Sequence, residues 1–222
     1  DLHSFPTRRS SDLKQKQKLF EEFHYHLTKA PKPSEYFNEI DEKSNIFSKV
    51  YPFTMLGDLK RIEQSPQHHP EGNVWNHTMQ VVDMAAQNRQ KSREPDVFMW
   101  AALLHDLGKA PTTRLRKGRI TAYDHDRVGA EMAVRFLREF TQDTVFIDKV
   151  SKLVRWHMQI LYVVKDLPFA NIEKMAEEVS IDEIALLGLC DRLGRQPMSE
   201  EKIQEEHRNI ERFLQKCRQF SK

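Results

Sequence analysis

The stretch that decides the fold is AALLHDLGKA, residues 101–110. Four apolar residues run directly into His105 and Asp106, and Gly108 follows. Glycine is the usual residue just beyond a helix C-terminus, so the stretch predicts a buried helix whose last turn carries a histidine and a carboxylate. Burying both side chains is costly unless their charge is compensated. A divalent cation would compensate it, because imidazole and carboxylate both ligate first-row metals; a hydrogen-bonded His–Asp pair that caps the helix is the alternative.

Composition places the chain among soluble, helix-rich proteins. It has 222 residues, of which 39% are hydrophobic and 31% charged, with only seven glycines; this suits one domain with a proper core. The formal net charge of +2 is too small to imply an obligatory nucleic-acid partner. Cys190 and Cys217 lie in helical patterns without CxxC spacing, so we expect buried thiols and a cytoplasmic protein. No apolar run approaches the length of a membrane span, and we expect no membrane partner.

The first thirteen residues, DLHSFPTRRSSDL, differ from the rest of the chain. They lack periodicity, they are not a signal peptide, and they resemble the conceptual translation of a sequencing-adapter oligonucleotide. We therefore interpret residues 1–13 as a non-native tail, disordered or docked without a role.

Apolar residues recur at helical spacing through most of the remaining chain. The predicted helices span residues 14–29, 35–41, 47–50, 54–63, 74–85, 127–140, 145–158, 171–179, 182–195 and 199–220, besides the one that ends at the His-Asp pair. Thr54, Asn73 and Asp126 are the expected N-caps of three of them. Residues 65–73 are a loop, and the basic segment 111–126 is a small hairpin or an extended loop. The fold class that follows is all-α, a compact bundle of about seven to nine helices.

Histidines and carboxylates fall at the ends of these apolar helices in the order H…HD…H…H…D. They are His77, His105, Asp106, His125, His157 and Asp191. A lone histidine on an apolar helix face is more often a core residue than a ligand, but here several recur together.

These motifs resemble the HD-domain superfamily of metal-dependent phosphohydrolases. The resemblance covers roughly residues 57–196 and rests on HPEGNVWNHT, AALLHDLGK, the HD of YDHDRVGAE, LVRWH and CDRLGR. Within the superfamily, the likeness is greatest to the HD domain of bacterial CCA-adding tRNA nucleotidyltransferases. The third motif, often GHE, departs mildly, since it reads Asp124-His125-Asp126 here. The resemblance implies an N-terminal helical extension at 14–56, an HD domain at 57–198 and a C-terminal helix at 199–222.

The resemblance also implies the ligand set of a metal centre. His77, His105, Asp106 and Asp191 would hold one ion, and Asp106 would offer its second oxygen to another, completed by His125 and His157. Such a mixed set suits manganese, iron, cobalt, nickel or zinc, and magnesium is also compatible. Water activated by one or two such divalent ions would then attack a phosphoryl group, with no covalent enzyme intermediate.

Nearby cations are candidates for contacts with the substrate. Lys109 would act as a catalytic residue that steadies a phosphate or a leaving oxygen; alternatively it complements a helix C-terminus. Arg192 and Arg195 follow Asp191 and would clamp phosphate. Arg114, with the other cations of the basic segment, would contact the substrate or remain solvated.

We therefore expect a stand-alone HD domain that hydrolyses a phosphomonoester or phosphodiester of a nucleotide or a nucleic-acid end. Only 76 residues precede His77, and they contain no Gly-Ser followed by a paired Asp-x-Asp, so nucleotide addition is not expected. The partners would be a small phosphorylated substrate, such as a nucleotide, or an RNA end. The alternative is a non-catalytic RNA-binding or nucleotide-sensing module with a structural metal.

Overall fold

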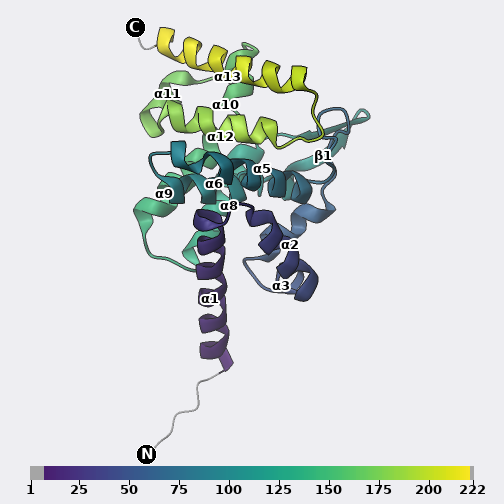
Figure 1. The fold of residues 1–222 in the computed structure, drawn as a ribbon, viewed down its shortest axis with the longest axis vertical. Helices are drawn as coiled ribbons and strands as arrows, with labels where there is room; N and C mark the ends of the chain where they lie inside the picture. The colour runs from purple at the N-terminus through teal and green to yellow at the C-terminus, as the bar shows by residue number, and fades with distance from the viewer. Residues whose placement is uncertain (1–7, 221–222) are drawn as a thin grey trace, which may run out of the picture.

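The computed structural model describes residues 8–220, with side chains from residue 11 onward, and the fold is helical apart from one hairpin (Figure 1). Eight of the helices in this part of the chain have ten or more residues: α1 (Arg8–Lys29), α2 (Pro33–Lys43), α5 (Val74–Asn88), α6 (Pro95–Leu104), α8 (His125–Arg138), α9 (Thr144–Trp156), α12 (Ile181–Leu193) and α13 (Glu200–Phe220). The predicted all-α class is confirmed.

Shorter elements connect the long helices. They are α3 (Ile46–Lys49), α4 (Thr54–Gly57), η1 (Asp58–Arg61), η2 (Arg89–Lys91), α7 (Lys109–Thr112), α10 (Gln159–Val164) and α11 (Ile172–Glu178), with strands β1 (Thr113–Arg116) and β2 (Arg119–Ala122). The two strands pair antiparallel, so of the two predicted alternatives the segment forms the hairpin and not the extended loop. No helix in residues 8–220 is long and apolar enough to cross a membrane.

Helix α6 is the centre of the bundle. Every residue from Val97 to Leu104 is buried, and the helix packs against α1, α5, α9 and α12. The helices are stacked in layers: α13 covers α12 at one end of the molecule, and α1 and α2 lie at the other (Figure 1). The core helix therefore ends in the interior, where water does not compensate polar groups.

The N-terminal helix begins earlier than expected. Helix α1 starts at Arg8 instead of residue 14, so residues 8–13 are helical and continuous with the predicted helix. The rest of the predicted tail, residues 1–7, lies outside the described residues. The predicted apolar face is confirmed, since Phe23 and Leu27 are fully buried.

One of the three predicted N-caps is confirmed and two are wrong. The Asn73 side chain accepts a hydrogen bond from the backbone N–H of Asn76 at 2.9 Å and caps α5. Helix α4 has Phe53 at its N-cap position, and Thr54 is its first residue. Helix α8 has Asp124 at that position, because the chain enters it from the hairpin through a left-handed residue (φ 62°) and the helix then starts at His125.

The predicted role of Gly108 is also wrong, for a steric reason. Gly108 has an ordinary right-handed φ of −65°, so it is not a left-handed helix cap. A Cβ at this position would lie 2.0 Å from the backbone oxygen of His125 and 2.6 Å from the backbone nitrogen of Gly129. The glycine is needed because α8 passes directly over the turn that follows the His-Asp pair.

Candidate metal centre

The six predicted ligand residues converge at one place from five parts of the chain. They are all buried, at most 8% exposed: His77 on α5, His105 and Asp106 just after α6, His125 at the start of α8, His157 just after α9, and Asp191 on α12. Residues of this set that are more than 100 positions apart in the sequence come together because α5 and α12 pack directly against each other.

The first group of ligand atoms surrounds the Nε2 atoms of two histidines. His77 Nε2 lies 2.8 Å from Asp191 Oδ1 and 3.7 Å from Asp106 Oδ2. His105 Nε2 lies 3.2 Å from Asp106 Oδ2 and 3.6 Å from Asp191 Oδ1. Four ligand atoms of mixed nitrogen and oxygen type are therefore close enough to share one cation.

The second group forms around the other oxygen of Asp106. His125 Nε2 and His157 Nε2 lie 3.5 Å and 3.6 Å from Asp106 Oδ1, and 3.2 Å from each other. Both groups contain three or more buried side chains able to hold an ion. Asp106 belongs to both groups, so its carboxylate lies between two neighbouring candidate sites and contributes one oxygen to each.

Backbone carbonyls orient three of the histidines. The Nδ1 atoms of His105, His125 and His157 lie 2.7, 2.9 and 2.6 Å from the carbonyl oxygens of residues 102, 122 and 154. An Nδ1–H that donates to a carbonyl leaves Nε2 with its lone pair free for a metal, which is the usual arrangement of ligating histidines.

Unsatisfied buried atoms indicate that the centre is built for cations. His105 Nε2 and Asp106 Oδ2 are both buried, and although they lie 3.2 Å apart, neither makes a hydrogen bond of good geometry. Such orphaned atoms are rare in folded proteins and call for an explanation. The donor set and these two atoms together fit one or two divalent ions.

Charges within the centre shift several pKa values. Burial opposes ionisation of Asp106 and Asp191, yet hydrogen bonds and charge from His105 and its neighbours hold the pKa of both carboxyls well below the usual range. Burial likewise opposes a charged His105, but the two carboxylates raise its pKa to about 10. Burial lowers the pKa of His125 to about 4, so this imidazole is neutral near pH 7. The carboxylates are therefore ionised, whereas His105 must lose a proton to ligate a metal.

Sequence analysis missed Glu71, whose side chain is fully buried beside His77. Its Oε1 lies 2.7 Å from His77 Nδ1 and 2.9 Å from His69 Nδ1. Burial raises the carboxyl pKa, but the hydrogen bonds from His69 and His77 outweigh it and the pKa falls to about 2. HPEG was the only available signal, and a carboxylate in a polar loop shows no periodicity that would distinguish it from solvated charge.

A cavity of about 410 Å³ opens onto this centre. Its wall includes four of the six residues of the proposed ligand set: Asp106, His125, His157 and Asp191. Five cationic side chains line the same space: Lys109, Lys165, Arg192, Arg195 and Lys202. The cavity therefore places residues of the proposed ligand set next to groups that attract anions.

The predicted substrate residues occupy three different settings. Lys109 Nζ lies 3.0 Å from Asp106 Oδ2 and 2.8 Å from Gln64 Oε1, at the rim of the centre. The Nε atom of Arg195 is buried without a hydrogen-bond partner. The guanidinium of Arg192 is held by Glu206 of α13 at 2.8 Å, a contact that sequence analysis missed.

Arg114, in contrast, does not line the cavity. It is exposed on β1, and its guanidinium donates to the carbonyl oxygen of Thr113, its neighbour.

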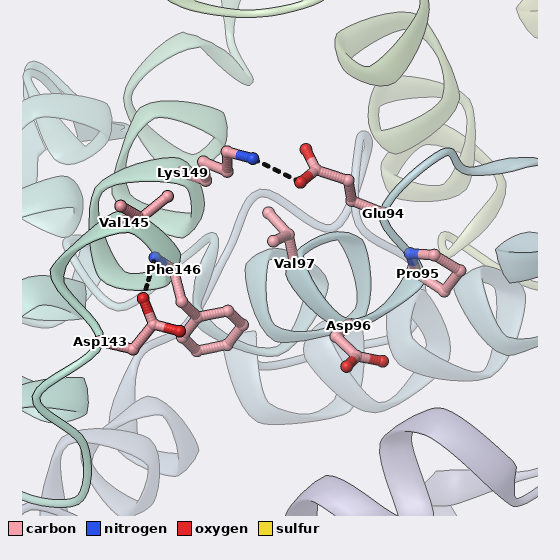
Figure 2. Close-up of a pocket in the computed structure, with 8 residues that line it drawn as sticks. All are labelled: Glu94, Pro95, Asp96, Val97, Asp143, Val145, Phe146 and Lys149. Atoms are coloured by element: carbon pink, nitrogen blue, oxygen red, sulfur yellow. Dashed lines mark hydrogen bonds and ion pairs between the residues drawn. The ribbon is translucent and has the colours of Figure 1, made fainter.

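Another hollow, about 400 Å³, lies between α6 and α9 but holds no comparable chemistry (Figure 2). Its polar groups are largely occupied, since Lys149 pairs with Glu94 at 2.5 Å and Asp143 caps α9 through the backbone N–H of Phe146. No histidine or cysteine lines it.

Comparison with known proteins agrees with this geometry. The family model described as "HD domain" matches residues 74–196 and includes all six ligand residues. The chain is 34% identical over 146 residues to the "Multifunctional CCA protein" of Aromatoleum aromaticum, which covers 63% of this chain and 34% of the relative. It is 33% identical over 117 residues to the "A-adding tRNA nucleotidyltransferase" of Deinococcus radiodurans, covering 50% of this chain and 26% of the relative. The aligned part thus spans about a third or less of these relatives' length.

Proposed function

Since the chain belongs to the HD domain family, we propose that it is a metal-dependent phosphohydrolase acting on a phosphomonoester or phosphodiester of a nucleotide or of a nucleic-acid end. The observation that carries this proposal is the position of Asp106. Its Oδ2 faces His105 and its Oδ1 faces His125 and His157, so one buried carboxylate serves two sets of imidazoles.

His77, His105, Asp106 and Asp191 would hold one divalent ion, and Asp106, His125 and His157 a second. Bound there, such ions supply Lewis acidity, which makes water a competent nucleophile near neutral pH and neutralises charge on the phosphoryl group. The protein keeps the imidazoles oriented through backbone carbonyls, so little reorganisation is required when the substrate arrives.

Lys109 and Arg195 would bind the phosphoryl group at the mouth of the centre. Lys109 Nζ is within 3.0 Å of Asp106, and its charge therefore lies where a phosphoryl oxygen or a leaving oxygen would be placed. Arg195 lines the same cavity with an unpartnered Nε, so it has a donor available for a phosphate oxygen. Arg192 is a weaker candidate because Glu206 already occupies its guanidinium.

The charge of the cavity favours a phosphate ester over a neutral substrate. Five cationic side chains line it against four carboxylates. Two of those carboxylates, Asp106 and Asp191, would be neutralised by metal, and Glu206 is paired with Arg192. The remaining surface is positive, as an anionic substrate requires.

The test is hydrolysis of small phosphoesters by protein loaded in turn with manganese, iron, cobalt, nickel, zinc or magnesium. We expect turnover with at least one of these ions for p-nitrophenyl phosphate, bis(p-nitrophenyl) phosphate or a 2′,3′-cyclic nucleotide. Asp106→Ala should abolish it while circular dichroism still shows the helical fold. Asp83→Asn, which alters a half-buried carboxylate that contacts Ser34 on the far side of α5, is the control and should retain turnover.

Retained hydrolysis in Asp106→Ala would contradict the role given to that carboxylate. Saturable nucleotide or RNA binding without any product, with every ion, would replace the proposal by a binding or sensing module whose metal only stabilises the fold.

A further inference from the structure

The hairpin formed by β1 and β2 is a concentrated basic surface beside the metal centre. Residues 107–123 contain no acidic side chain and five cationic ones, although the chain as a whole is nearly neutral. Four of these cations, Arg114, Arg116, Lys117 and Arg119, are exposed on the hairpin. None of the four forms an ion pair with any residue in the described range 8–220.

The strand register places three of the cations on one face. Residues that pair across an antiparallel ladder point to the same side, and successive residues alternate. Arg116 pairs with Arg119 and Arg114 with Thr121, so these side chains form a row, while Leu115 and Ile120 share the opposite face. Lys117 and Gly118 both have positive φ at the tip, as two-residue hairpin turns require, which holds the row in place.

Both ends of the hairpin are fixed to the proposed active site. Its first strand follows α7, which begins at Lys109, and its second strand ends at Ala122, whose carbonyl oxygen lies 2.9 Å from His125 Nδ1. Lys109 and His125 both line the cavity. The hairpin is therefore attached at both ends to segments that contribute to the cavity wall.

An exposed aromatic ring lies at the junction. Tyr123 is 64% exposed, directly between the hairpin and His125. The Arg116 guanidinium lies 5.3 Å from the centre of its ring. A row of cations next to an exposed aromatic ring is the combination by which proteins bind single-stranded nucleic acid, with phosphates on the cations and a base on the ring.

We propose that the hairpin is a docking arm for a single-stranded polynucleotide whose phosphorylated end lies in the metal centre. This inference rests on the proposed function and specifies its substrate class. A single strand is favoured because the ligands are almost fully buried, and a strand end reaches them where the body of a duplex would not. An acidic polypeptide would use the cations but would leave Tyr123 without a partner.

The test compares two variants that each remove three cations. The hairpin variant carries Arg116→Gln, Lys117→Asn and Arg119→Gln; asparagine is chosen because Lys117 has φ 48° and asparagine tolerates the left-handed region. The control carries Lys14→Gln, Lys16→Gln and Lys18→Gln on α1, which does not line the cavity and extends away from the hairpin (Figure 1). Binding of a short fluorescein-labelled single-stranded RNA with a 3′-phosphate is measured by anisotropy.

We expect the hairpin variant to bind this RNA about tenfold or more weakly at low salt, and the control within about threefold of the unaltered protein. The slope of log Kd against log salt should fall by about 2 in the hairpin variant, because three contacts to a single strand are lost. Tyr123→Ala should weaken binding about fivefold or more, whereas Tyr25→Ala, an exposed tyrosine on α1, should not. Turnover of p-nitrophenyl phosphate or a 2′,3′-cyclic nucleotide should be unchanged in all four variants.

Equal losses in the hairpin and α1 variants would overturn the inference, and so would competition by poly-glutamate as strong as that by unlabelled single-stranded RNA. The proposed function fails separately. If the unaltered protein bound RNA through the hairpin but hydrolysed no phosphoester, the docking arm would stand and the hydrolase would not. If it hydrolysed phosphoesters but bound RNA independently of the hairpin, the reverse would hold.

Discussion

Glu71 controls the orientation of His77, a residue of the proposed ligand set, without belonging to that set itself. Its Oε1 accepts from His77 Nδ1, which fixes the ring so that Nε2 points at Asp191. Carboxylates in this position also increase the basicity of the ligating imidazole, and their loss reduces metal affinity by roughly 10–100-fold. The buried carboxylate is therefore part of the metal centre in energetic terms.

We predict that Glu71→Gln lowers the affinity for the first divalent ion by at least about tenfold while the fold persists. Isothermal titration with zinc or manganese measures this, and Glu63→Gln, a carboxylate in the same region with no ion pair among the described residues, is the control. Unchanged affinity in Glu71→Gln would show that His77 is held by the Gly194 carbonyl alone, which lies 3.0 Å from the same nitrogen.

The sequence predicted the residues at helix ends and missed those in loops and across interfaces. The six residues of the proposed ligand set were predictable from the HD-domain resemblance, and several of them also interrupt an apolar face or end an apolar run, where a polar side chain is conspicuous. Glu71 sits in a polar loop and Glu206 on a highly charged helix, so neither differs from its neighbours in sequence. Their partners, His77 and Arg192, come from other elements, and only the packed structure brings them together.

At the scale of elements, the approach of α8 to the turn after α6 determines where two ligands meet. Gly108 lies against the backbone of His125 and Gly129. Any side chain here would push α8, and with it His125, away from Asp106. The same contact that supports the fold therefore sets a distance within the metal centre.

Gly108→Ala should destabilise the protein by about 2 kcal/mol or more, because the new Cβ meets backbone atoms that cannot rotate away. It should also weaken binding of the second ion. Urea unfolding and metal titration measure the two effects. Gly118→Ala, at the hairpin tip with φ 76° and nothing within 4 Å, should cost only about 1 kcal/mol and leave metal binding intact. A similar loss in both variants would contradict this steric argument.

The pair between Arg192 and Glu206 attaches α13 to α12, and it should make stability depend on pH. Burial raises the pKa of the Glu206 carboxyl, but the opposing effect of Arg192 and Lys202 is larger. The pKa is therefore below its ordinary value of 4.5. The unfolded chain then takes up this proton first as the pH falls. The pair's contribution is therefore complete above about pH 5 and is lost as the pH falls through 4.5 towards the folded pKa.

Glu206→Gln should accordingly cost about 1–2 kcal/mol of unfolding free energy at pH 7, and this difference should shrink below about pH 4. Urea unfolding at several pH values measures it. Glu205→Gln, which removes an exposed carboxylate that pairs with Lys202, should have a small effect at every pH. A difference that stayed constant down to pH 3 would exclude titration of Glu206 as the cause.

Element positions were predicted well and their junctions poorly. The apolar periodicity placed the long helices, and the Lys117-Gly118 turn placed the hairpin. The sequence did not reveal α10, because its short apolar run follows His157 without a break and such runs fit several structures. The predicted start of α8 was wrong for a related reason: a left-handed residue such as Asp124 produces no signal in the periodicity of apolar residues.

For the molecule as a whole, the buried charges make metal binding and folding interdependent. The ligands come from α5, α8 and α12 and from the ends of α6 and α9, so an ion would crosslink the bundle at its centre. No hydrogen bond of good geometry reaches His105 Nε2 or Asp106 Oδ2 in the core. Metal should therefore bind the folded state strongly and the unfolded chain weakly.

We predict that chelation lowers the melting temperature by several degrees, and that reloading restores it. A ligand present at about 100 times its Kd adds about 2.7 kcal/mol to stability. Elemental analysis of the reloaded protein should give about two equivalents per chain. One equivalent would restrict the centre to His77, His105, Asp106 and Asp191, and no uptake with an unchanged melting temperature would contradict the metal centre.

Helix α13 has a consequence for how substrate preference can be altered. It lies outside residues 74–196, the part that matches the family, yet its Lys202, Glu205, Glu206 and Asn209 form one wall of the cavity. The residues of the proposed ligand set and this wall are thus encoded in separate stretches of the gene. Engineering that replaced only the final helix would reshape the chamber without altering any residue of the proposed ligand set, so the selectivity and the rate of the proposed reaction could be changed separately.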